Sequence, residues 1–251
     1  HWDEKRKKYA KQTGAVRRGV GMALFSYKTG VWPISLEIAG ARLSLNQDGS
    51  VQLQLGATEI GQGADTVFSQ MVAETLQTDM AHVHIQTVQD TDVSPFDTGA
   101  YASRQSFVTG TAVKHCAEIL RDKILAYAKT LLPEVDTREL SLHDNWIWAG
   151  EEQAISLAAL AEESYYSLTN SSVLTAEVSE QVKKNTIATG CCFAEVEVDI
   201  KLGKIKILHI INVHDSGKLL NPQLAEMQVH GGMSMGMGYG LSEQLILDEK
   251  T

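Results

Sequence analysis

Two stretches of the chain alternate hydrophobic and polar residues with a period of two, and this alternation constrains the fold more than any other feature. The first stretch covers residues 41–55 and contains the turn sequence Asn-Gln-Asp-Gly at 46–49. The second covers residues 192–213 and contains Lys-Leu-Gly at 201–203. Because successive side chains of a strand point to opposite faces of a sheet, each stretch predicts two strands with one buried face, joined as a hairpin.

Hydrophobic residues at a spacing of three to four indicate helices around the predicted hairpins. Segments with this pattern, or with a charged or glycine-rich helical composition, are residues 1–12, 67–76, 110–132, 156–164 and 223–240. Short strands are predicted near 83–88 and 146–148. Since hairpins rather than strand–helix–strand crossovers link the strands, the pattern favours an α+β fold with hairpin-linked mixed sheets and packed helices over a doubly wound sheet.

Charge and composition exclude two classes of function. A formal net charge of -9 argues against a general nucleic-acid binder, which needs a basic face to displace counterions from phosphates. No apolar run approaches the roughly 18 residues of a membrane span. Three cysteines, two of them adjacent at 191 and 192, form no disulfide framework and no cysteine metal motif. We therefore expect a cytoplasmic protein that binds neither nucleic acid nor a membrane.

The segment Gly61-Gln62-Gly63 lies between a predicted strand and a predicted helix. Glycines at this position would let backbone N–H groups approach an anion, and the dipole of the helix would add partial positive charge. Gln62 would add a side-chain amide that can donate to an oxo group or pair with the polar edge of a ring. The alternative is a tight turn with a surface glutamine, and the short Gly-x-Gly spacing does not exclude it.

A second polar segment, Tyr-Ala-Ser-Arg-Gln-Ser at 101–106, precedes the helix expected from Gly110. It gathers hydroxyls, a guanidinium and an amide, the groups that bind a phosphate or the edge of a pterin. A polar helix-capping loop would have the same composition. Gln228 lies in the glycine-rich helix, where glycines recur every four residues from 232 to 240 and would let a backbone or a ligand approach. A surface glutamine is the alternative there.

Four motifs follow one another along the chain. They are Gly-Ala-Thr-Glu-Ile-Gly-Gln-Gly at 56–63 with Ala-Asp-Thr after it, Ala-Ser-Arg at 102–104 with Gly110, Phe-Ala-Glu-Val-Glu-Val-Asp at 193–199, and Asn-Pro at 221–222 followed by Gln228 and Gly-Gly at 231–232. In this order they resemble the molybdenum-binding subunit of the xanthine dehydrogenase and aldehyde oxidase family. Each motif alone is weak, but the ordered set is specific, and the similarity extends from about Gly14 to the end of the chain.

The resemblance implies a domain of the family's second molybdenum-binding type, with a molybdenum–molybdopterin cofactor that bacterial members commonly carry as the cytosine dinucleotide. It places Gln62 beside the molybdenum oxo and pterin groups, the 102–105 segment against the pterin and phosphate region, and Gln228 against the pterin. The expected cofactor-binding residues are Gly61, Gln62, Gly63, Ala102, Ser103, Arg104, Gln105 and Gln228, and no residue is expected to ligate the metal directly.

The match to the family is partial. The family's catalytic base is a glutamate in a Gly-Glu motif near the C-terminus of the full subunit, and this sequence contains neither that motif nor the preceding molybdenum-binding domain. It also lacks an initiator methionine, cysteine motifs for iron–sulfur clusters and a flavin site. We therefore expect residues 1–251 to be a partial molybdopterin-binding domain without a catalytic residue, inactive when isolated.

The expected function is the cofactor-binding part of a molybdenum hydroxylase, most like a bacterial xanthine dehydrogenase. The family oxidises a purine, another N-heterocycle or an aldehyde with oxygen from water. Expected partners are the remaining segments of the molybdenum subunit and the iron–sulfur and flavin (FAD) subunits of a hetero-oligomer. The alternative is a non-catalytic scaffold or assembly module that keeps the fold. A Rossmann enzyme is disfavoured because the Gly-x-Gly lacks a third glycine and a parallel βαβ frame.

Overall fold

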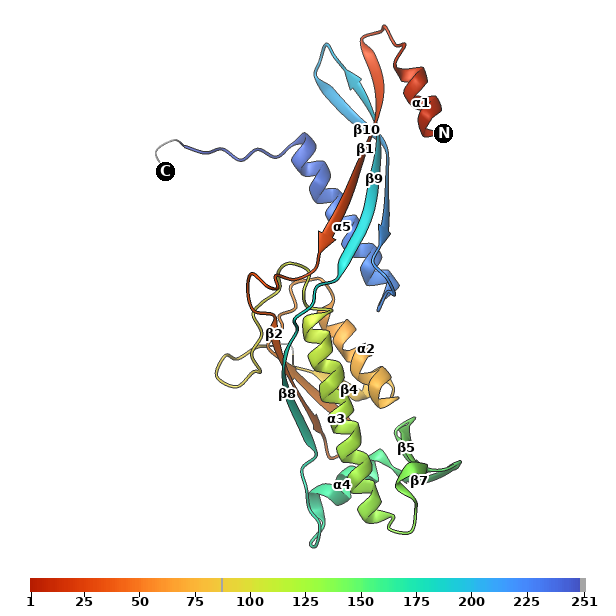
Figure 1. Cartoon of the computed structure of the whole chain (residues 1–251), viewed down its shortest axis with the longest axis vertical. Helices are drawn as coiled ribbons and strands as arrows, with labels where there is room; N and C mark the ends of the chain where they lie inside the picture. The colour runs from red at the N-terminus through yellow and green to blue at the C-terminus, as the bar shows by residue number, and fades with distance from the viewer. Residues whose placement is uncertain (87, 249–251) are drawn as a thin grey trace. The chain divides into compact units, whose positions relative to one another are not determined.

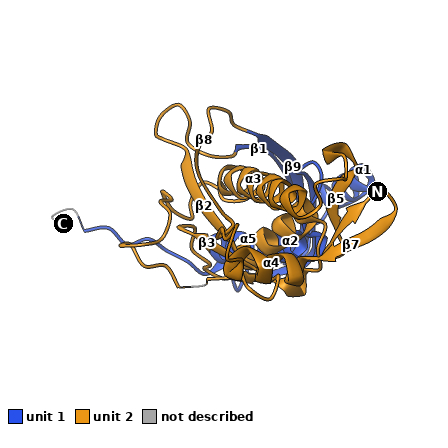
Figure 2. Cartoon of the chain, turned by 90° about the horizontal axis from the view of Figure 1, so that it is seen from below, with its two compact units in different colours: residues 1–28, 186–251 blue, residues 29–185 orange. Residues whose placement is uncertain are grey.

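The computed structural model describes residues 1–86 and 88–248, and the chain divides into two compact units (Figure 2). Unit 1 consists of residues 1–28 and 186–251, and unit 2 consists of residues 29–185. Figure 1 labels their helices and strands. Open sheets, helices and β-hairpins give an α+β architecture, as the sequence predicts. Within the described ranges, no helix has the length and apolar character needed to cross a membrane.

A four-stranded sheet forms the centre of unit 2. Its strand order is β4 (Val83–Ile85), β3 (Val51–Leu55), β2 (Ile38–Leu45) and β8 (Thr175–Gln181). β2 and β3 pair antiparallel, which confirms the hairpin predicted at 41–55. β8 pairs antiparallel with β2, whereas β4 pairs parallel with β3, so the sheet is mixed. β4 corresponds to the strand predicted near 83–88, and residue 87 of that prediction lies outside the described residues.

Two helices, α2 (Ala64–Leu76) and α3 (Val108–Leu131), pack together and against this sheet (Figure 1). The core between them contains Leu43 and Leu53 from the sheet, Phe68 from α2 and Leu120 from α3, each at most 1% exposed. Burial of a side chain of this size stabilises the folded state by about 1.5–3 kcal/mol. The core therefore holds the two loops that precede α2 and α3 on a common framework.

The remainder of unit 2 is a small antiparallel sheet followed by a short helix. The elements are β5 (Leu140–His143), β6 (Trp146–Ala149), β7 (Glu152–Ser156) and α4 (Leu157–Tyr166), with single 3-10 turns at Met80–His82 and Thr137–Glu139. The hydroxyl of Ser156 caps α4 by accepting a hydrogen bond from the N–H of Ala159. The strand predicted at 146–148 and the helix predicted at 156–164 are both present.

Unit 1 is a three-stranded antiparallel sheet with one helix from each end of the chain. The strand order is β1 (Val16–Lys28), β9 (Ile187–Asp199) and β10 (Lys204–Asp215). β9 and β10 confirm the hairpin predicted at 192–213 and extend it. The helices are α1 (Trp2–Tyr9) and α5 (Pro222–Leu241), close to the predicted ranges. The side chain of Asn221 caps α5 by accepting from the N–H of Leu224.

Unit 1 has almost no buried interior. No residue of α1, α5, β1 or β10 is buried. Among the described residues of this unit only Glu195 on β9 is buried, and its carboxylate accepts hydrogen bonds from Lys5 and Tyr9 of α1. Large hydrophobic side chains stay exposed on the strands and on α5, including Leu24 and Ile211. The sheet of unit 1 is thus held together mainly by its backbone pairing.

Candidate functional site

The loop that contains Gly61, Gln62 and Gly63 connects β3 with α2, as the sequence predicts. The two glycines have φ angles of 98° and 87°, in the left-handed region that residues with a Cβ atom adopt only with strain. Nothing lies within 4 Å of a Cβ atom built on Gly61, so its backbone conformation, rather than a lack of space, requires glycine. The two glycines therefore set the direction of Gln62 between them.

The carboxylate of Glu59 fills the N-terminal end of α2. Its Oε1 atom accepts hydrogen bonds from the N–H groups of Gly61 (2.7 Å) and Gly63 (3.0 Å), and its Oε2 atom accepts one from Asp65 (3.1 Å). Partial burial opposes the charged form, but these backbone donors outweigh it and lower the pKa of the Glu59 carboxyl. Burial, and then the charge of Glu59, raise the pKa of the Asp65 carboxyl.

The expectation that the N–H groups of both glycines are free to bind an external anion is therefore wrong. Glu59 lies only a few residues before α2, so its carboxylate reaches the positive end of the helix and satisfies N–H groups that would otherwise lack partners. The backbone N–H of Gln62 has no acceptor among the described residues. Within the Gly-Gln-Gly motif, the backbone N–H of Gln62 is thus the donor that remains open to a ligand.

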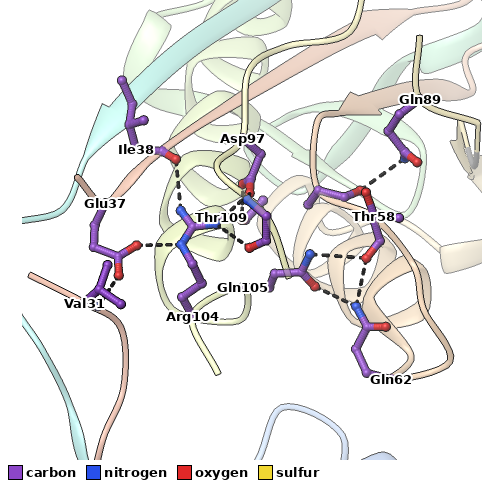
Figure 3. Close-up of polar contacts among 12 residues, drawn as sticks. Val31, Glu37, Ile38, Thr58, Gln62, Gln89, Asp97, Arg104, Gln105 and Thr109 are labelled. Atoms are coloured by element: carbon purple, nitrogen blue, oxygen red, sulfur yellow. Dashed lines mark hydrogen bonds and ion pairs between the residues drawn. The ribbon is translucent and has the colours of Figure 1, made fainter. Parts of the chain in front are cut away.

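Two side-chain amides, those of Gln62 and Gln105, join the loop before α2 to the loop before α3 (Figure 3). Nε2 of Gln62 donates to Oε1 of Gln105 at 2.6 Å and to the carbonyl oxygen of Thr58 at 3.0 Å. Nε2 of Gln105 donates to the same carbonyl at 3.2 Å, and Oε1 of Gln62 accepts from the N–H of Ile60 at 2.7 Å. The structure therefore brings together two predicted site residues that are 43 positions apart in the sequence.

Ala102 and Ser103 give the second loop an uncommon backbone. Their φ angles are 50° and 52°, although neither residue is glycine. The carbonyl oxygen of Ala102 accepts a hydrogen bond from the N–H of Gly30 at 2.8 Å, which ties the loop to the segment before β2. In the described part of the chain, the N–H groups of Ala102 and Ser103 have no acceptor. Backbone held in such conformations clusters at ligand-binding sites, and here it presents two unpaired donors.

Arg104 anchors this loop from inside unit 2. Its side chain is 0% exposed and donates from Nε to Glu37 at 2.5 Å, from Nη1 to Asp97 at 2.6 Å, and from Nη2 to the carbonyl oxygen of Ile38 at 2.9 Å (Figure 3). Burial opposes the charge, but the two carboxylates outweigh it and raise the pKa of the guanidinium. The sequence predicts that this guanidinium binds the pterin and phosphate region of a cofactor. In the structure it lies in the interior instead, where it fixes the loop to the start of β2.

The acidic residues that organise both loops were missed in the sequence. Glu37 lies 67 positions from Arg104, so no local pattern links them. Asp97 is closer, but its second partner, the hydroxyl of Thr109 at 2.7 Å, lies on α3. The motif at 56–63 contains Glu59 but does not predict its role. The available signal was a carboxylate two residues before a Gly-x-Gly that opens a helix, where unpaired N–H groups attract it.

The last predicted site residue, Gln228, belongs to unit 1 and not to unit 2. It is exposed on α5. The Cβ positions of Gly231, Gly232, Gly236 and Gly240 on the same helix have no neighbour within 4 Å. The glycine spacing predicts that a backbone or a ligand packs closely against this helix. None of the residues that the structure describes packs closely at these four positions.

The groups at the two loops suit a polar organic ligand. The free N–H groups of Gln62, Ala102 and Ser103 can donate to oxo groups and ring nitrogens, and the amide oxygens of Gln62 and Gln105 can accept from ring N–H groups. Across residues 1–86 and 88–248, no cluster of three or more His, Cys, Asp or Glu is arranged to ligate a metal ion. A cofactor whose organic part presents a hydrogen-bonding edge fits this set of groups.

Comparison with known proteins gives relatives over the whole chain. A sequence model of a family described as a molybdopterin cofactor-binding domain matches residues 1–251. The chain is 49% identical to a putative xanthine dehydrogenase molybdenum-binding subunit of Escherichia coli (strain K12), over 100% of this chain and 34% of the relative. It is 31% identical to a probable hypoxanthine oxidase of the same strain, over 94% of this chain and 24% of the relative. The chain thus spans about a third of the length of the first relative and about a quarter of the length of the second.

Two solved structures share the fold. Quinoline 2-oxidoreductase from Pseudomonas putida 86 superimposes with a TM-score of 0.84 at 22% identity, over 98% of this chain and 33% of that one. Reconstituted CO dehydrogenase from Oligotropha carboxidovorans gives a TM-score of 0.84 at 24% identity, over 99% of this chain and 32% of that one. At this level of identity the likeness establishes the fold alone, and it agrees with the α+β prediction.

Proposed function

The chain belongs to the molybdopterin cofactor-binding domain family, and on that premise we propose that its two site loops hold the pterin of a molybdenum cofactor in a hydroxylase related to xanthine dehydrogenase. The family and the molybdopterin cofactor were both expected from the sequence motifs, and both are confirmed. The substrate, the form of the cofactor and the residues that bind it belong to the proposal.

The main support for this proposal is that Gln62 and Gln105 are hydrogen-bonded to each other and both donate to the carbonyl oxygen of Thr58. It joins the two motif segments into one polar surface, beside which the N–H groups of Ala102 and Ser103 are unpaired. Gly61 and Gly63 shape the first loop by their positive φ angles. We assign cofactor binding to these residues, and cofactor binding is also proposed for Gln228 of unit 1.

Each residue has a distinct part in the proposal. The backbone donors at 102 and 103 bind oxygen atoms of the cofactor, and the amide of Gln62 binds the pterin edge. Arg104 acts indirectly, by holding the second loop in place. When bound, the molybdenum–pterin group, proposed to be the cytosine dinucleotide form, supplies the redox chemistry that hydroxylates a purine, another N-heterocycle or an aldehyde with oxygen from water. No residue of this chain is proposed as the catalytic base, so the isolated chain should not turn over.

We propose that partners bind at unit 1. The exposed hydrophobic side chains of β1, β10 and α5 would gain stability from burial, and the chain spans 34% of the curated relative with 49% identity. We infer that other segments of the same molybdenum subunit cover these faces. Iron–sulfur and flavin subunits or domains complete the proposed hetero-oligomer and carry the electrons away.

The test replaces Gln62 or Gln228 by alanine in the full-length molybdenum subunit and measures molybdenum and pterin nucleotide per subunit. Loss of one hydrogen-bonding partner at a buried ligand costs about 1–3 kcal/mol, which lowers the affinity for the ligand about 5- to 150-fold. Gln153→Ala is the matched control, because Gln153 is exposed on β7 of unit 2. Both site variants should lose cofactor, and the control should not.

One observation favours the alternative of a non-catalytic scaffold. The side-chain amides of Gln62 and Gln105 already satisfy each other and the Thr58 carbonyl inside the chain. A scaffold with this arrangement would be insensitive to cofactor. Full molybdenum and pterin content in both the Gln62 and the Gln228 variants would therefore support the scaffold and contradict the cofactor-binding role.

A further inference from the structure

The carboxylate of Glu59 lies inside the site loop, yet cofactor binding gives it no part. It accepts three backbone hydrogen bonds, from Gly61, Gly63 and Asp65, all within six positions of sequence. These donors are the peptide groups that a helix N-terminus normally offers to an external anion. In this chain, the internal carboxylate takes them instead.

Two of these donors lie on either side of Gln62 in the sequence. Gly61 precedes Gln62 and Gly63 follows it, and both glycine N–H groups donate to the same oxygen, Oε1 of Glu59. Glycine has more backbone freedom than any other residue, so a loop with two glycines around a glutamine needs an external constraint to hold one conformation. A single carboxylate oxygen provides that constraint on both sides of Gln62.

We propose that Glu59 is a positioning residue, whose carboxylate occupies the N-terminal end of α2 and fixes the two peptide groups on either side of Gln62 so that Gln62 meets the cofactor. This inference rests on the proposed cofactor-binding function of Gln62. It also specifies the chemistry of the contact. Cofactor oxyanions do not bind to the N–H groups of Gly61 and Gly63, and the loop meets the cofactor through the uncharged backbone N–H and side-chain amide of Gln62.

The two carboxylate oxygens of Glu59 accept different numbers of hydrogen bonds, so different substitutions of Glu59 should have effects of different size. Oε1 holds the two glycine N–H groups, and Oε2 holds only the N–H of Asp65. Glu59→Gln keeps one amide oxygen for the glycines but turns an NH2 group toward the N–H of Asp65, and it removes the charge that strengthens all three bonds. Glu59→Ala removes every acceptor. The alanine variant should therefore be affected more than the glutamine variant.

The experiment uses the full-length molybdenum subunit with Glu59→Ala, Glu59→Gln or Gln62→Ala. The matched control is Glu74→Gln, because Glu74 is exposed near the other end of α2. The first readout is hydrogen–deuterium exchange, resolved at the amides of residues 61, 63 and 65 in cofactor-free subunit, with the amides of α3 as the measure of intact folding. The second readout is the molybdenum and pterin content of subunit produced with the cofactor.

Exchange at the three amides should rise about tenfold or more in Glu59→Ala, rise less in Glu59→Gln, and stay unchanged in Glu74→Gln and Gln62→Ala. Cofactor content should fall in the same order in the Glu59 variants, while exchange in α3 stays unchanged. Unchanged exchange at the three amides in Glu59→Ala would overturn the inference.

Two outcomes separate this inference from the proposed function. If Gln62→Ala loses cofactor but Glu59→Ala retains it fully, despite faster loop exchange, Glu59 does not position Gln62 and the cofactor-binding function stands. If Gln62→Ala retains full cofactor, the proposed function itself fails, and the cofactor-directed role of Glu59 fails with it.

Discussion

The two units of this chain carry similar hairpins but differ in what covers them. In unit 2 α3 packs against β2 of the β2–β3 hairpin, α2 packs against α3 and β4, and Leu43 and Leu53 are 0% exposed. In unit 1 the long strands leave Leu24 75% exposed and Ile211 58% exposed. Alternating hydrophobic residues therefore predict a strand with an apolar face, but they do not say whether the chain itself buries that face.

The proposed site residues of the two units are supported differently. The polar groups of the two loops in unit 2 rest on a buried framework, which includes Arg104 and its two carboxylates. Gln228 of unit 1 lies on α5, a helix with no buried residue. If other subunit segments cover unit 1 as proposed, α5 depends on them, whereas hydrogen bonds within this chain shape the loops of unit 2.

The largest expected contrast is in cysteine reactivity. Cys116 on α3 is 0% exposed, and burial raises the pKa of its thiol to about 11. Cys191 and Cys192 on β9 are partly exposed. At pH 8, a thiol reagent should modify Cys116 at least about a thousandfold more slowly than Cys191 and Cys192. Cys116 can react only when unit 2 opens, and only its thiolate form reacts. Mass spectrometry of timed samples checks this, and equal rates at all three cysteines would break the comparison.

The next contrast lies within unit 2, between its interior and its surface. Arg104→Met leaves Glu37 and Asp97 buried without their counter-charge, which should lower the free energy of unfolding by about 3–5 kcal/mol. Arg42→Met is the control, since Arg42 pairs with Glu177 at a partly exposed site and should cost about 1 kcal/mol or less. Denaturant unfolding followed by tryptophan fluorescence measures both. Equal losses for the two variants would mean that the buried cluster does not support the loops.

The smallest contrast compares a glycine of each unit. Gly61→Ala forces a residue with a Cβ atom to a φ angle of 98° and should cost about 1–2 kcal/mol. Gly231→Ala, on a helix with open space around it, should instead stabilise α5 by about 0.5–1 kcal/mol in this chain. Thermal unfolding and exchange of α5 measure these changes. In the full-length subunit Gly231→Ala should become destabilising, and a stabilising effect there would show that nothing packs closely on this face.

Local periodicity was sufficient to predict both hairpins, α2, α3 and α5. It was insufficient for β1 and β8. In β1, glycines at 19 and 21 interrupt the alternation, and β8 is polar apart from Ala176 and Val178. The division into two units could not be predicted either, because it depends on the pairing of β1 with β9, strands from opposite ends of the sequence, which register Val16 with Asp199.

The loops of the proposed site could be placed between their strands and helices from the sequence, but the orientation of their polar groups could not. Gln62 and Gln105, both predicted from the motifs to bind the cofactor, are on loops that meet. The partner of the glycine N–H groups was not predictable from spacing, since Glu59 competes with any external anion for the same donors. The direction of Arg104 depends on Glu37, far away in the sequence, and only the folded sheet brings the two together.

Hydrogen–deuterium exchange of the full-length subunit, with and without its molybdenum cofactor, tests the central claim most directly. Cofactor-free subunit comes from cells that cannot make the pterin. The account predicts that bound cofactor slows exchange in residues 58–63 and 101–105 and leaves the β5–β7 sheet unchanged. Equal exchange in both loops, with and without cofactor, would contradict the assignment of the site.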